Sequence, residues 1–506
     1  MVEFQTDKYV LKGEGVEIWE PRFTYHGFRY VEVTGFPDKP TPENLCGCVV
    51  HTSLESLGEF ECSNEMFNAI QECARRSTLT NFHGVPTDCP HREKNPWTGD
   101  AQVSAEQALL NFNPTTAYMK WMRDFKDVQR KSGQLPGIVP TGGWGFNWGS
   151  GPAWDSAVIL IPWYVYLYKG DISLIEEMYS VMTKYIDFMS SMAYGHIVNF
   201  GLGDWCPPEG GPSGHKCPAE VTDTAYYFID ALIVSKIAVL LNKREDAAKY
   251  GELAKNIRKA FREKFIDFRT GTVKGDCQTS YACVLYQGLA DEDEEAGFLE
   301  KLVSQVKTQN EHIDCGILGA KYIMHALTEF GRADLAYGIA NQRTFPGWGY
   351  WIEQGATTLW EKWNGDSSRN HHMFSDISAW FYKGLAGINP DPEEPGFKHI
   401  ILRPNPVEGL TWVNCSHHSM YGKIVLNWIA QKDKLRIKVE VPVNCRAILY
   451  IPHNYSKDVR GWGRSDKSNF GICILKDKRN NVVCEIQSGA YEILALKVFN
   501  TGFKDI

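Results

Sequence analysis

The sequence DCPHREKNPWTGD occupies residues 88–100 and gives the chain its most informative pattern. It places three carboxylates, an arginine and a tryptophan within thirteen residues. Prolines at positions 90 and 96 disfavour a regular helix, so a shaped loop is expected. Carboxylates bind hydroxyl groups or transfer protons, and an aromatic ring covers an apolar sugar face. The stretch is therefore typical of a sugar-binding or sugar-cleaving site.

Length and composition indicate a globular protein of two or three domains. The 506 residues are 43% hydrophobic and 23% charged, as in proteins with sizeable cores. The formal net charge of −8 provides no basic surface, so nucleic acid and anionic membranes are not expected partners. No apolar run is long enough for a membrane span and the N-terminus shows no signal peptide, which favours a cytoplasmic location.

The cysteine pattern gives no sign of a disulfide framework or a metal site. Fourteen cysteines are scattered along the chain, so reduced thiols are expected. Cys46 and Cys48 with His51 lack a fourth ligand and the spacing of a zinc finger. No metal and no other cofactor is expected.

Hydrophobic periodicity divides the chain into three domains, at 1–60, 61–388 and 389–506. Residues 1–60 are expected to form a short N-terminal β segment, because residues 23–33 are rich in aromatic and β-branched side chains. About 60 residues are few for an independent β domain, so the segment packs on the next domain or ends a larger one.

Residues 61–388 show helical spacing from Met66, Phe67 and Ile70 onward. Roughly a dozen helical segments are expected, and no strand-like run separates them. By itself this pattern predicts a large, all-α domain. Helix starts are expected near Asp100, Asn113, Asp155, Ile172, Thr222, Glu245, Thr279, Glu292, Ile317, Ala333 and Asp376.

A proline-rich linker at 389–396 precedes a third region with strand-like runs. The runs favour a C-terminal antiparallel β-sandwich. They lie at residues 400–402, 422–426, 435–441, 447–451 and 491–496.

Three segments resemble the α-L-rhamnosidases of glycoside hydrolase family 78. Residues 88–102 resemble the family signature DCP-x-RE…WTGDAQ, and residues 348–363 resemble WGYMIENGATT-x-WERW. Residues 368–374 resemble SLNHYMF, with Arg369 and His372 as departures. The resemblance implies that residues 61–388 form an (α/α)6 toroid whose loops build a funnel-shaped site at one end. The short β segment would then be the end of the β domain that precedes the catalytic domain.

Cleavage of a glycosidic bond usually requires two carboxyl groups, one to protonate the leaving oxygen and one to attack or to activate water. Glu93 is the candidate acid, and repulsion from the nearby carboxylates should raise the pKa of at least one of the three acids. The resemblance implies Glu361 as general base, with Glu353 as its rival. It also implies inversion, for which the two carboxyl groups should lie roughly 6.5–9.5 Å apart.

Other side chains are expected to build the sugar pocket. The resemblance makes His371 a ligand of a sugar hydroxyl, and a glycine-rich aromatic loop at 141–155 could cover a C6 methyl group. Helix capping or core packing is an alternative for Asp204 and Trp205. The expected substrate-binding residues are Asp88, Arg92, Trp97, Asp100, Trp144, Trp148, Trp154, Asp155, Asp204, Trp205, Trp360 and His371.

These observations predict an inverting glycoside hydrolase that releases terminal α-L-rhamnose by general acid and general base catalysis. The expected partner is a rhamnose-containing glycoside, and a homodimer is an open alternative to a monomer. Two other functions stay open: another glycosidase on the same toroid, and a non-catalytic carbohydrate-binding protein.

Overall fold

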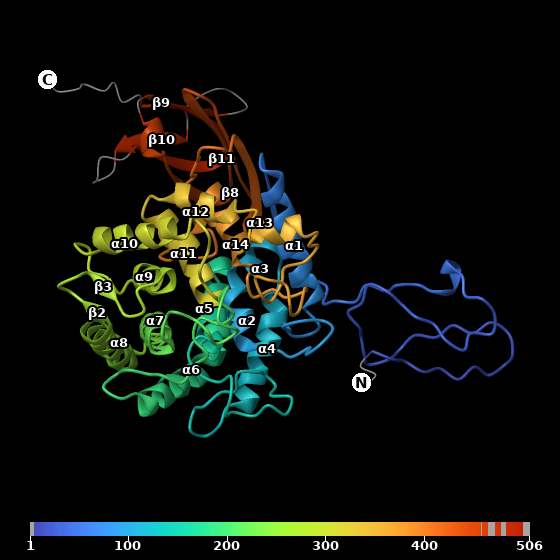
Figure 1. Ribbon diagram of the computed structural model, residues 1–506. Helices are drawn as coiled ribbons and strands as arrows, with labels where there is room; N and C mark the ends of the chain where they lie inside the picture. The colour runs from blue at the N-terminus through green and yellow to red at the C-terminus, as the bar shows by residue number, and fades with distance from the viewer. Residues whose placement is uncertain (1–4, 457, 464–470, 477–481, 499–506) are drawn as a thin grey trace.

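The computed structural model describes residues 5–456, 458–463, 471–476 and 482–498 (Figure 1). Helices fill the middle of the chain, close to most of the starts that periodicity predicts. The expected helix from Asp100 is divided at Ser104, which ends α2 and precedes α3. The α-helices are α1 (Glu65–Thr80), α2 (Thr98–Val103), α3 (Ala105–Asn111), α4 (Thr115–Val128), α5 (Ala157–Lys169), α6 (Ser173–Met192), α7 (Ala219–Leu240), α8 (Arg244–Phe265), α9 (Gln278–Tyr286), α10 (Glu295–Thr308), α11 (Ile317–Glu329), α12 (Ala333–Ala340), α13 (Trp348–Glu353) and α14 (Asp376–Trp380); α14 continues as the π-helix η2 (Phe381–Ala386).

The helices differ in how much of their surface is buried. In α5, α7 and α9 most side chains are buried, including residues on opposite faces. In α8 the buried residues follow one stripe, Tyr250, Ala254, Ile257, Phe261 and Phe265. A helix that is apolar all round lies in a core, whereas a one-sided helix covers it. The distribution of buried residues along each helix thus distinguishes inner helices from outer ones.

The inner helices form a closed cycle. Helices α3, α5, α7, α9, α11 and α14 contact one another in this order, and α14 returns to α3. Each has an outer neighbour that precedes or follows it in the chain, such as α8 against α7 and α10 against α9. The last inner helix therefore lies beside the first, and both also contact α1.

A buried ionic network connects three of these inner helices. The Lys321 ammonium lies 3.4 Å from Glu106 and 3.3 Å from Asp376, and its side chain is almost fully buried. His325 lies 2.7 Å from Asp376, and Lys383 lies 2.6 Å from Glu106. Burial alone would raise the pKa of the Glu106 carboxyl, but the surrounding cations lower it far below its usual value. The network therefore holds α3, α11 and α14 together as ions.

The C-terminal part of the chain is a sheet whose strands are longer than the sequence suggests. Strand β8 unites the two runs predicted at 435–441 and 447–451, and β11 pairs with it along most of its length. The positive φ of 63° at Asn444 lies within this bent strand. The strands outside the helical region are β1 (Gly58–Cys62), β4 (Ile388–Pro390), β5 (His399–Leu402), β6 (Trp412–Ser419), β7 (Gly422–Ala430), β8 (Lys434–Tyr450), β9 (Asp458–Gly463), β10 (Ile472–Lys476) and β11 (Val482–Leu496); the short hairpin β2 (Ile266–Asp267) and β3 (Thr272–Val273) follows α8.

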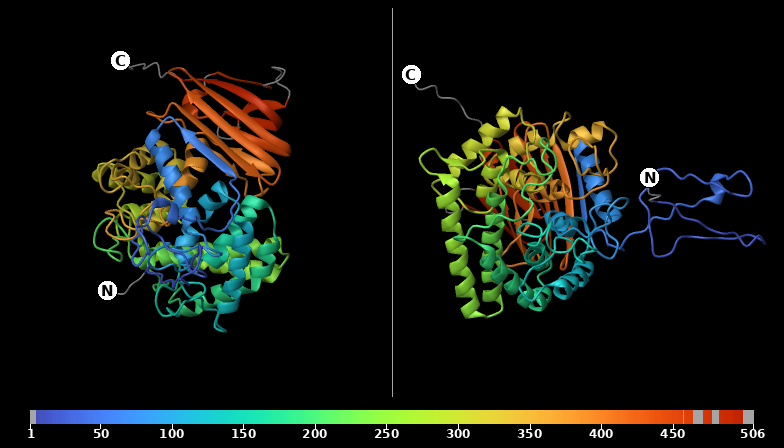
Figure 2. Two further views of the ribbon diagram at one scale, coloured as in Figure 1. Left: turned by 90° about the vertical axis from the view of Figure 1, so that its right-hand side faces the viewer. Right: turned by 60° about the horizontal axis from the view of Figure 1, so that its bottom comes forward.

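These nine strands join in one sheet, whose C-terminal strands are orange and red in Figure 2 and whose first strand, β1, is blue. Its pairings are antiparallel except between β5 and β8, which are parallel. The prediction of antiparallel β structure is thus confirmed, and the long strands β8 and β11 continue their hydrogen bonding through the whole domain. Strand β1 pairs with β6, so a strand that precedes the helices completes the C-terminal sheet.

The prediction of strands at 23–33 is wrong. Residues 5–57 form no strand in the described chain, only the 3-10 helix η1 (Pro42–Asn44), and most of them are exposed. Figures 1 and 2 show this segment extending away from the helices. A strand needs a partner for its backbone groups, and nothing in the described chain pairs with this run. The segment contacts the body at several points, among them Tyr25, whose ring stacks on His83 at 3.9 Å and whose carbonyl accepts a hydrogen bond from Lys94.

Two further observations concern membrane-spanning helices and cysteine thiols. None of the helices in the described ranges combines the length and the hydropathy needed to cross a bilayer. All fourteen cysteines are free thiols in the structure. The cytoplasmic location and the homodimer stay predictions.

The buried network predicts a large effect at Lys321. Lys321→Met leaves Glu106 and Asp376 buried without this cation, so the free energy of unfolding should fall by about 3–5 kcal/mol. Denaturant unfolding followed by tryptophan fluorescence measures the change. Lys259→Met, on the exposed side of α8, is the matched control and should stay within about 0.5 kcal/mol. Equal effects of the two substitutions would contradict a stabilising role for the network.

Candidate active site

The loop 88–100 is closed by its own hydrogen bonds. The Asp88 amide donates to the Asn95 carbonyl at 2.9 Å, and the Asn95 amide donates to Asp88 Oδ1 at 2.8 Å. The loop ends at Trp97, which precedes α2. Gly99 then packs against the Trp154 ring so closely that a Cβ would lie 2.4 Å from it. These contacts fix the loop backbone and therefore the direction in which the Arg92 and Glu93 side chains point.

A second segment, residues 359–371, approaches this loop from the other end of the helical region. The Glu361 amide donates to the Ser368 carbonyl, and the His371 amide donates to the Leu359 carbonyl, both at 2.9 Å. The Leu359 amide donates to Ser77 Oγ of α1 at 2.8 Å. This hairpin-like segment is thereby anchored on the first helix.

Arg92 joins the two segments through a single nitrogen. Its Nη2 lies 2.8 Å from Glu361 Oε2 and 3.1 Å from Glu93 Oε1. The distance between Glu93 Oε1 and Glu361 Oε2 therefore cannot exceed the sum of these two distances. The Arg92 side chain is 43% exposed and those of Glu93 and Glu361 are 30% and 13% exposed, so the group of three opens to solvent.

Glu361 is held as a carboxylate. Its Oε2 accepts hydrogen bonds from Arg92, from Ser367 Oγ at 2.6 Å and from the Ser368 amide at 3.1 Å. Burial alone would raise the pKa of the Glu361 carboxyl, but the charges of His371 and Arg92 and these hydrogen bonds outweigh burial and lower it. The hydrogen bonds use Oε2, which leaves Oε1 for a water molecule.

Glu353, the rival for the role of base, lies elsewhere. Its side chain is 45% exposed and forms an ion pair with Arg343. Nothing in the described structure brings Glu353 to Arg92. The geometry therefore favours Glu361.

Tryptophans form one side of the site. Trp97 Nε1 donates to Glu93 Oε2 at 2.9 Å, and its ring lies 5.8 Å from that of Trp144 and 5.6 Å from that of Trp148. Trp148 also contacts Trp205 at 6.1 Å. Trp144 and Trp148 are about half exposed and can cover a sugar face next to Glu93.

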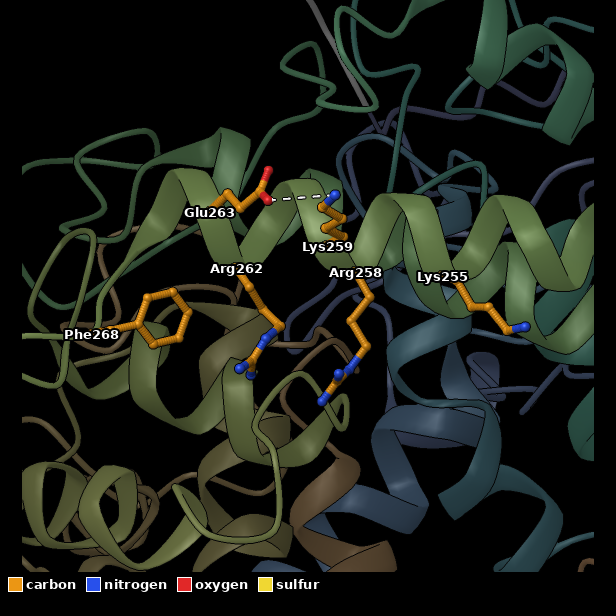
Figure 3. Close-up of a pocket in the computed structure, with 6 residues that line it drawn as sticks. All are labelled: Lys255, Arg258, Lys259, Arg262, Glu263 and Phe268. Carbon is orange, nitrogen blue, oxygen red and sulfur yellow. Dashed lines mark ion pairs between the residues drawn. The ribbon is translucent and has the colours of Figure 1, made fainter.

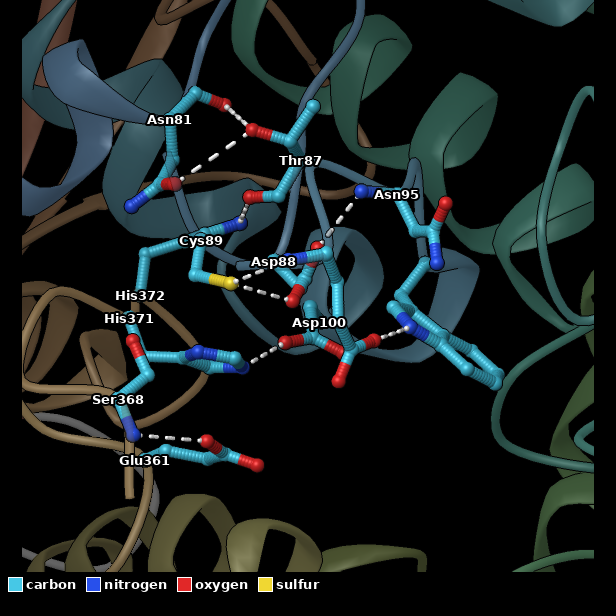
Figure 4. A network of polar contacts seen from close by, with 12 residues as sticks. Asn81, Thr87, Asp88, Cys89, Asn95, Asp100, Glu361, Ser368, His371 and His372 are labelled. Atoms are coloured by element: carbon cyan, nitrogen blue, oxygen red, sulfur yellow. Dashed lines mark hydrogen bonds and ion pairs between the residues drawn. The ribbon is translucent and has the colours of Figure 1, made fainter. Parts of the chain in front are cut away.

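A buried polar cluster lies near Glu361 (Figure 4). Its members are Asp88, Cys89, Asp100 and His371, all of them buried. His371 Nε2 lies 2.8 Å from Asp100 Oδ1, and Cys89 Sγ is hydrogen-bonded to Asp88 Oδ2 at 2.9 Å. The neighbouring His372 is held by Ser104 and the Thr87 carbonyl, each at 2.9 Å.

The cluster shifts the pKa values of three of its members, Asp88, Cys89 and His371. Burial raises the pKa of Asp88 to about 10, with a smaller contribution from the charge of Asp100. Burial also acts to raise the pKa of Cys89, but the closeness and the charge of His371 outweigh it and lower that pKa to about 6. Burial acts to lower the pKa of His371, but Asp100 and Cys89 raise it well above its usual value. The predicted rise in pKa therefore falls on Asp88, and burial is its main cause.

Three residues expected to bind the sugar, Trp154, Asp155 and Trp360, are packed inside the protein. Asp155 is buried and accepts hydrogen bonds from Ser150 Oγ and the Gly151 amide. Trp154 packs beneath Gly99. Trp360 is buried, with the Arg369 guanidinium 4.6 Å above its ring.

Asp204 has a structural role as well. Its two oxygens accept hydrogen bonds from the amides of Gly316, Leu318 and Gly319 at the start of α11, and from Thr279 Oγ1. A carboxylate at a helix N-terminus satisfies free amides and is favoured by the helix dipole. For Asp204, capping is thus what the geometry supports.

Sequence reasoning missed the residues that support the glutamates. Ser367 and Ser368 hold Glu361, and Asn95 holds Asp88. Cys89 lies inside the signature, so its adjacency to Asp88 was a usable signal. No pattern in the sequence singles out Ser367.

A groove of about 370 Å³ lies along α8 rather than beside the loop 88–100 (Figure 3). Its arginines are already paired, Arg258 with Asp291 and Arg262 with Glu294, each at 2.8 Å. It contributes nothing to the arrangement around Arg92. The groove is lined by Lys255, Arg258, Lys259, Arg262, Glu263 and Phe268.

Family models match the chain in three successive parts. The concanavalin-like domain of bacterial α-L-rhamnosidases matches residues 1–51, their six-hairpin glycosidase domain matches residues 55–385, and their C-terminal domain matches residues 387–464. The α-L-rhamnosidase of Streptomyces avermitilis is 33% identical over an alignment of 469 positions, which covers 90% of this chain and 44% of that protein. An α-L-rhamnosidase of Formosa agariphila is 31% identical over an alignment of 509 positions, which covers 97% of this chain and 54% of that protein. The chain spans about half the length of the curated relatives it matches.

Solved structures show the same fold. The α-L-rhamnosidase from Dictyoglumus thermophilum superposes with a TM-score of 0.87 at 37% identity, over 95% of this chain and 55% of that one. The Streptomyces avermitilis enzyme in complex with L-rhamnose also gives a TM-score of 0.87, at 31% identity over 96% of this chain and 47% of that one.

The capping role of Asp204 leads to a stability test. Asp204→Ala leaves several buried amides without an acceptor, so the free energy of unfolding should fall by about 2–4 kcal/mol. Chemical denaturation measures the loss. Asp127→Ala, at an exposed position of α4, is the control and should change it by less than about 0.5 kcal/mol. An Asp204 variant as stable as this control would rule out capping as its role.

Proposed function

Because the chain belongs to the bacterial α-L-rhamnosidase family, we propose that it is an inverting glycoside hydrolase that releases terminal α-L-rhamnose from rhamnosides. The observation that carries the proposal is the meeting of Glu93 and Glu361 on Arg92. Residues 61–388 would form the (α/α)6 catalytic toroid, which the closed cycle of six inner helices supports. The assignment to glycoside hydrolase family 78 rests on the three sequence motifs.

The two glutamates have different surroundings that suit different roles. Glu361, with its lowered pKa, is the general base and removes a proton from water through Oε1. Glu93 is the general acid and protonates the glycosidic oxygen. Trp97 Nε1 and Arg92 fix the Glu93 carboxyl between them, so its orientation is set before substrate binds.

Inversion requires a change at Arg92. The nearest oxygens of Glu93 and Glu361 are closer than the roughly 6.5 Å at which the range of inverting enzymes begins. Arg92 also lies where water and sugar have to enter. We therefore assign to Arg92 a movement from one of the glutamates toward a sugar hydroxyl when substrate binds.

The sugar would lie between the loop 88–100 and the tryptophans. Asp88, Asp100 and His371 form the polar base of the site, and Trp97, Trp144 and Trp148 form its apolar side. The C6 methyl group of rhamnose suits an aromatic side, because a methyl group in that place gains contact without leaving a hydroxyl unpaired. The rhamnose complex of the Streptomyces avermitilis relative supports this choice of sugar.

Substitution of the glutamates tests the proposed roles. Glu93→Gln should lower kcat/KM by about 10²–10⁴-fold on an alkyl rhamnoside and less on a nitrophenyl rhamnoside, whose leaving group needs little protonation. Glu361→Gln should lower it by a similar factor on both substrates, because water activation is needed in each case.

Glu353→Gln is the matched control, since Glu353 is exposed and paired with Arg343. It should leave kcat/KM within about twofold of wild type on both substrates. Full activity of Glu93→Gln on the alkyl rhamnoside would contradict the proposed function.

The pH dependence tests the electrostatic role of Arg92. A base with a lowered pKa stays ionised to lower pH, so the acid limb of the kcat/KM profile lies at low pH in the wild type. Arg92→Met removes a cation from Glu361, so the pKa of Glu361 should rise and the acid limb should move to higher pH. Arg343→Met should not move it. An unchanged acid limb in Arg92→Met would contradict Glu361 as the base.

A further inference from the structure

Asp88, Cys89 and His371 form a group that the acid and base chemistry does not use directly. A carboxylate oxygen, the Cys89 sulfur and a His371 ring nitrogen all lie within 4.8 Å of one another, and all three side chains are buried (Figure 4). Within the described chain this is the one group of three or more such side chains at metal-ligand spacing. It combines sulfur, nitrogen and oxygen, the ligand set of zinc.

The second ring nitrogen of His371 is already oriented. Nε2 lies 2.8 Å from Asp100 Oδ1, whereas Nδ1 is buried without a hydrogen-bond partner among the described residues. A histidine that binds a metal through one nitrogen usually donates its other N–H to a carboxylate. Asp100 Oδ1 lies at the distance of such a carboxylate from Nε2, although it accepts no hydrogen bond in the structure, and this leaves Nδ1 as the ligand.

The two other ligands have comparable support. Asp88 Oδ1 accepts the Asn95 amide, so Oδ2 is the oxygen next to Cys89. The Glu93 amide lies 3.4 Å from Cys89 Sγ and donates to it. Two ligands of a tetrahedral zinc ion lie about 3.3–3.8 Å apart, so the 2.9 Å between Sγ and Oδ2 has to open by about half an ångström. The three atoms lie within 4.8 Å of one another, so a distance at that limit has to shorten by about 1 Å when a metal binds.

We propose that Asp88, Cys89 and His371 bind a divalent cation of the zinc class, and that this cation inhibits the enzyme. Three protein ligands leave a fourth position for water. Metal binding occupies Asp88 and His371, which the proposed function assigns to the sugar, so bound metal and bound sugar exclude each other. Because the ligands are buried, metal enters and leaves slowly. The proposal goes beyond the proposed function, and metal binding itself does not depend on that function.

Cobalt(II) provides a direct probe, because a thiolate ligand gives it a charge-transfer absorption band. The exposed thiols Cys46, Cys48 and Cys473 are first replaced by serine, so that they do not bind the ion. This parent protein, without substrate, should bind one Co²⁺ per chain with a thiolate band, and Zn²⁺ should displace it. Addition of Cys89→Ser should abolish the band, and His371→Gln should weaken binding at least tenfold. Cys73→Ser, at a buried thiol of α1, is the control and should change neither.

The outcomes separate metal binding from catalysis. Circular dichroism melts establish that each variant is folded. If the parent protein shows no thiolate band with Co²⁺, or if the band survives Cys89→Ser, the site does not exist, whatever the hydrolase activity is. If the band forms as expected, Zn²⁺ should also abolish rhamnoside hydrolysis, and chelation should restore it. Full hydrolysis with one Zn²⁺ bound would overturn the inhibitory role.

Discussion

One guanidinium group joins the beginning and the end of the helical region. Glu93 and Glu361 are 268 positions apart in the chain, yet both contact the same nitrogen of Arg92. Only a chain whose last helices return to the first can bring them together, and α14 does contact both α1 and α3. The site depends on this closure, because neither segment contains both glutamates.

The closure is supported by buried charge at two places. Lys321 holds α3, α11 and α14 together at the centre of the helices, and the pair of Asp100 and His371 supports the loop from below. Buried ion pairs contribute little net stability, but they fix geometry, since a displaced partner leaves a charge without compensation. The exposed group around Arg92 therefore lies on a rigid base.

Local periodicity was enough to predict most of the helices, because inner and outer helices both keep a spacing near 3.6 residues. The sheet was harder to predict. The run Trp412–Ser419 buries the polar side chains of Ser416 and His417, so its strand pattern is hidden. At residues 23–33 the composition favours a strand, but no partner exists in the described chain, and propensity alone does not make a sheet.

The candidate site, like the fold, could be predicted only in part from the sequence. The sequence motifs identified the residues around Arg92, since a signature specifies residue types at fixed spacing. They could not tell which acids lie in the open site around Arg92 and which are enclosed in the protein. Asp204 lies in a loop with tryptophan, as a sugar ligand would, but its oxygens are used by the first turn of α11. The contacts of Cys89 depend on His371, which is far away in sequence, so they become visible only in the fold.

The central claim is that two carboxylates face one rhamnose unit with room for a water molecule once Arg92 moves. The anomeric configuration of the first-formed rhamnose tests it most directly, followed by proton NMR during hydrolysis of an aryl α-L-rhamnoside. The account predicts that β-L-rhamnose forms first and then mutarotates. Initial release of α-L-rhamnose would contradict it, since Glu361 would then act as a nucleophile at the short separation found with Arg92 in place.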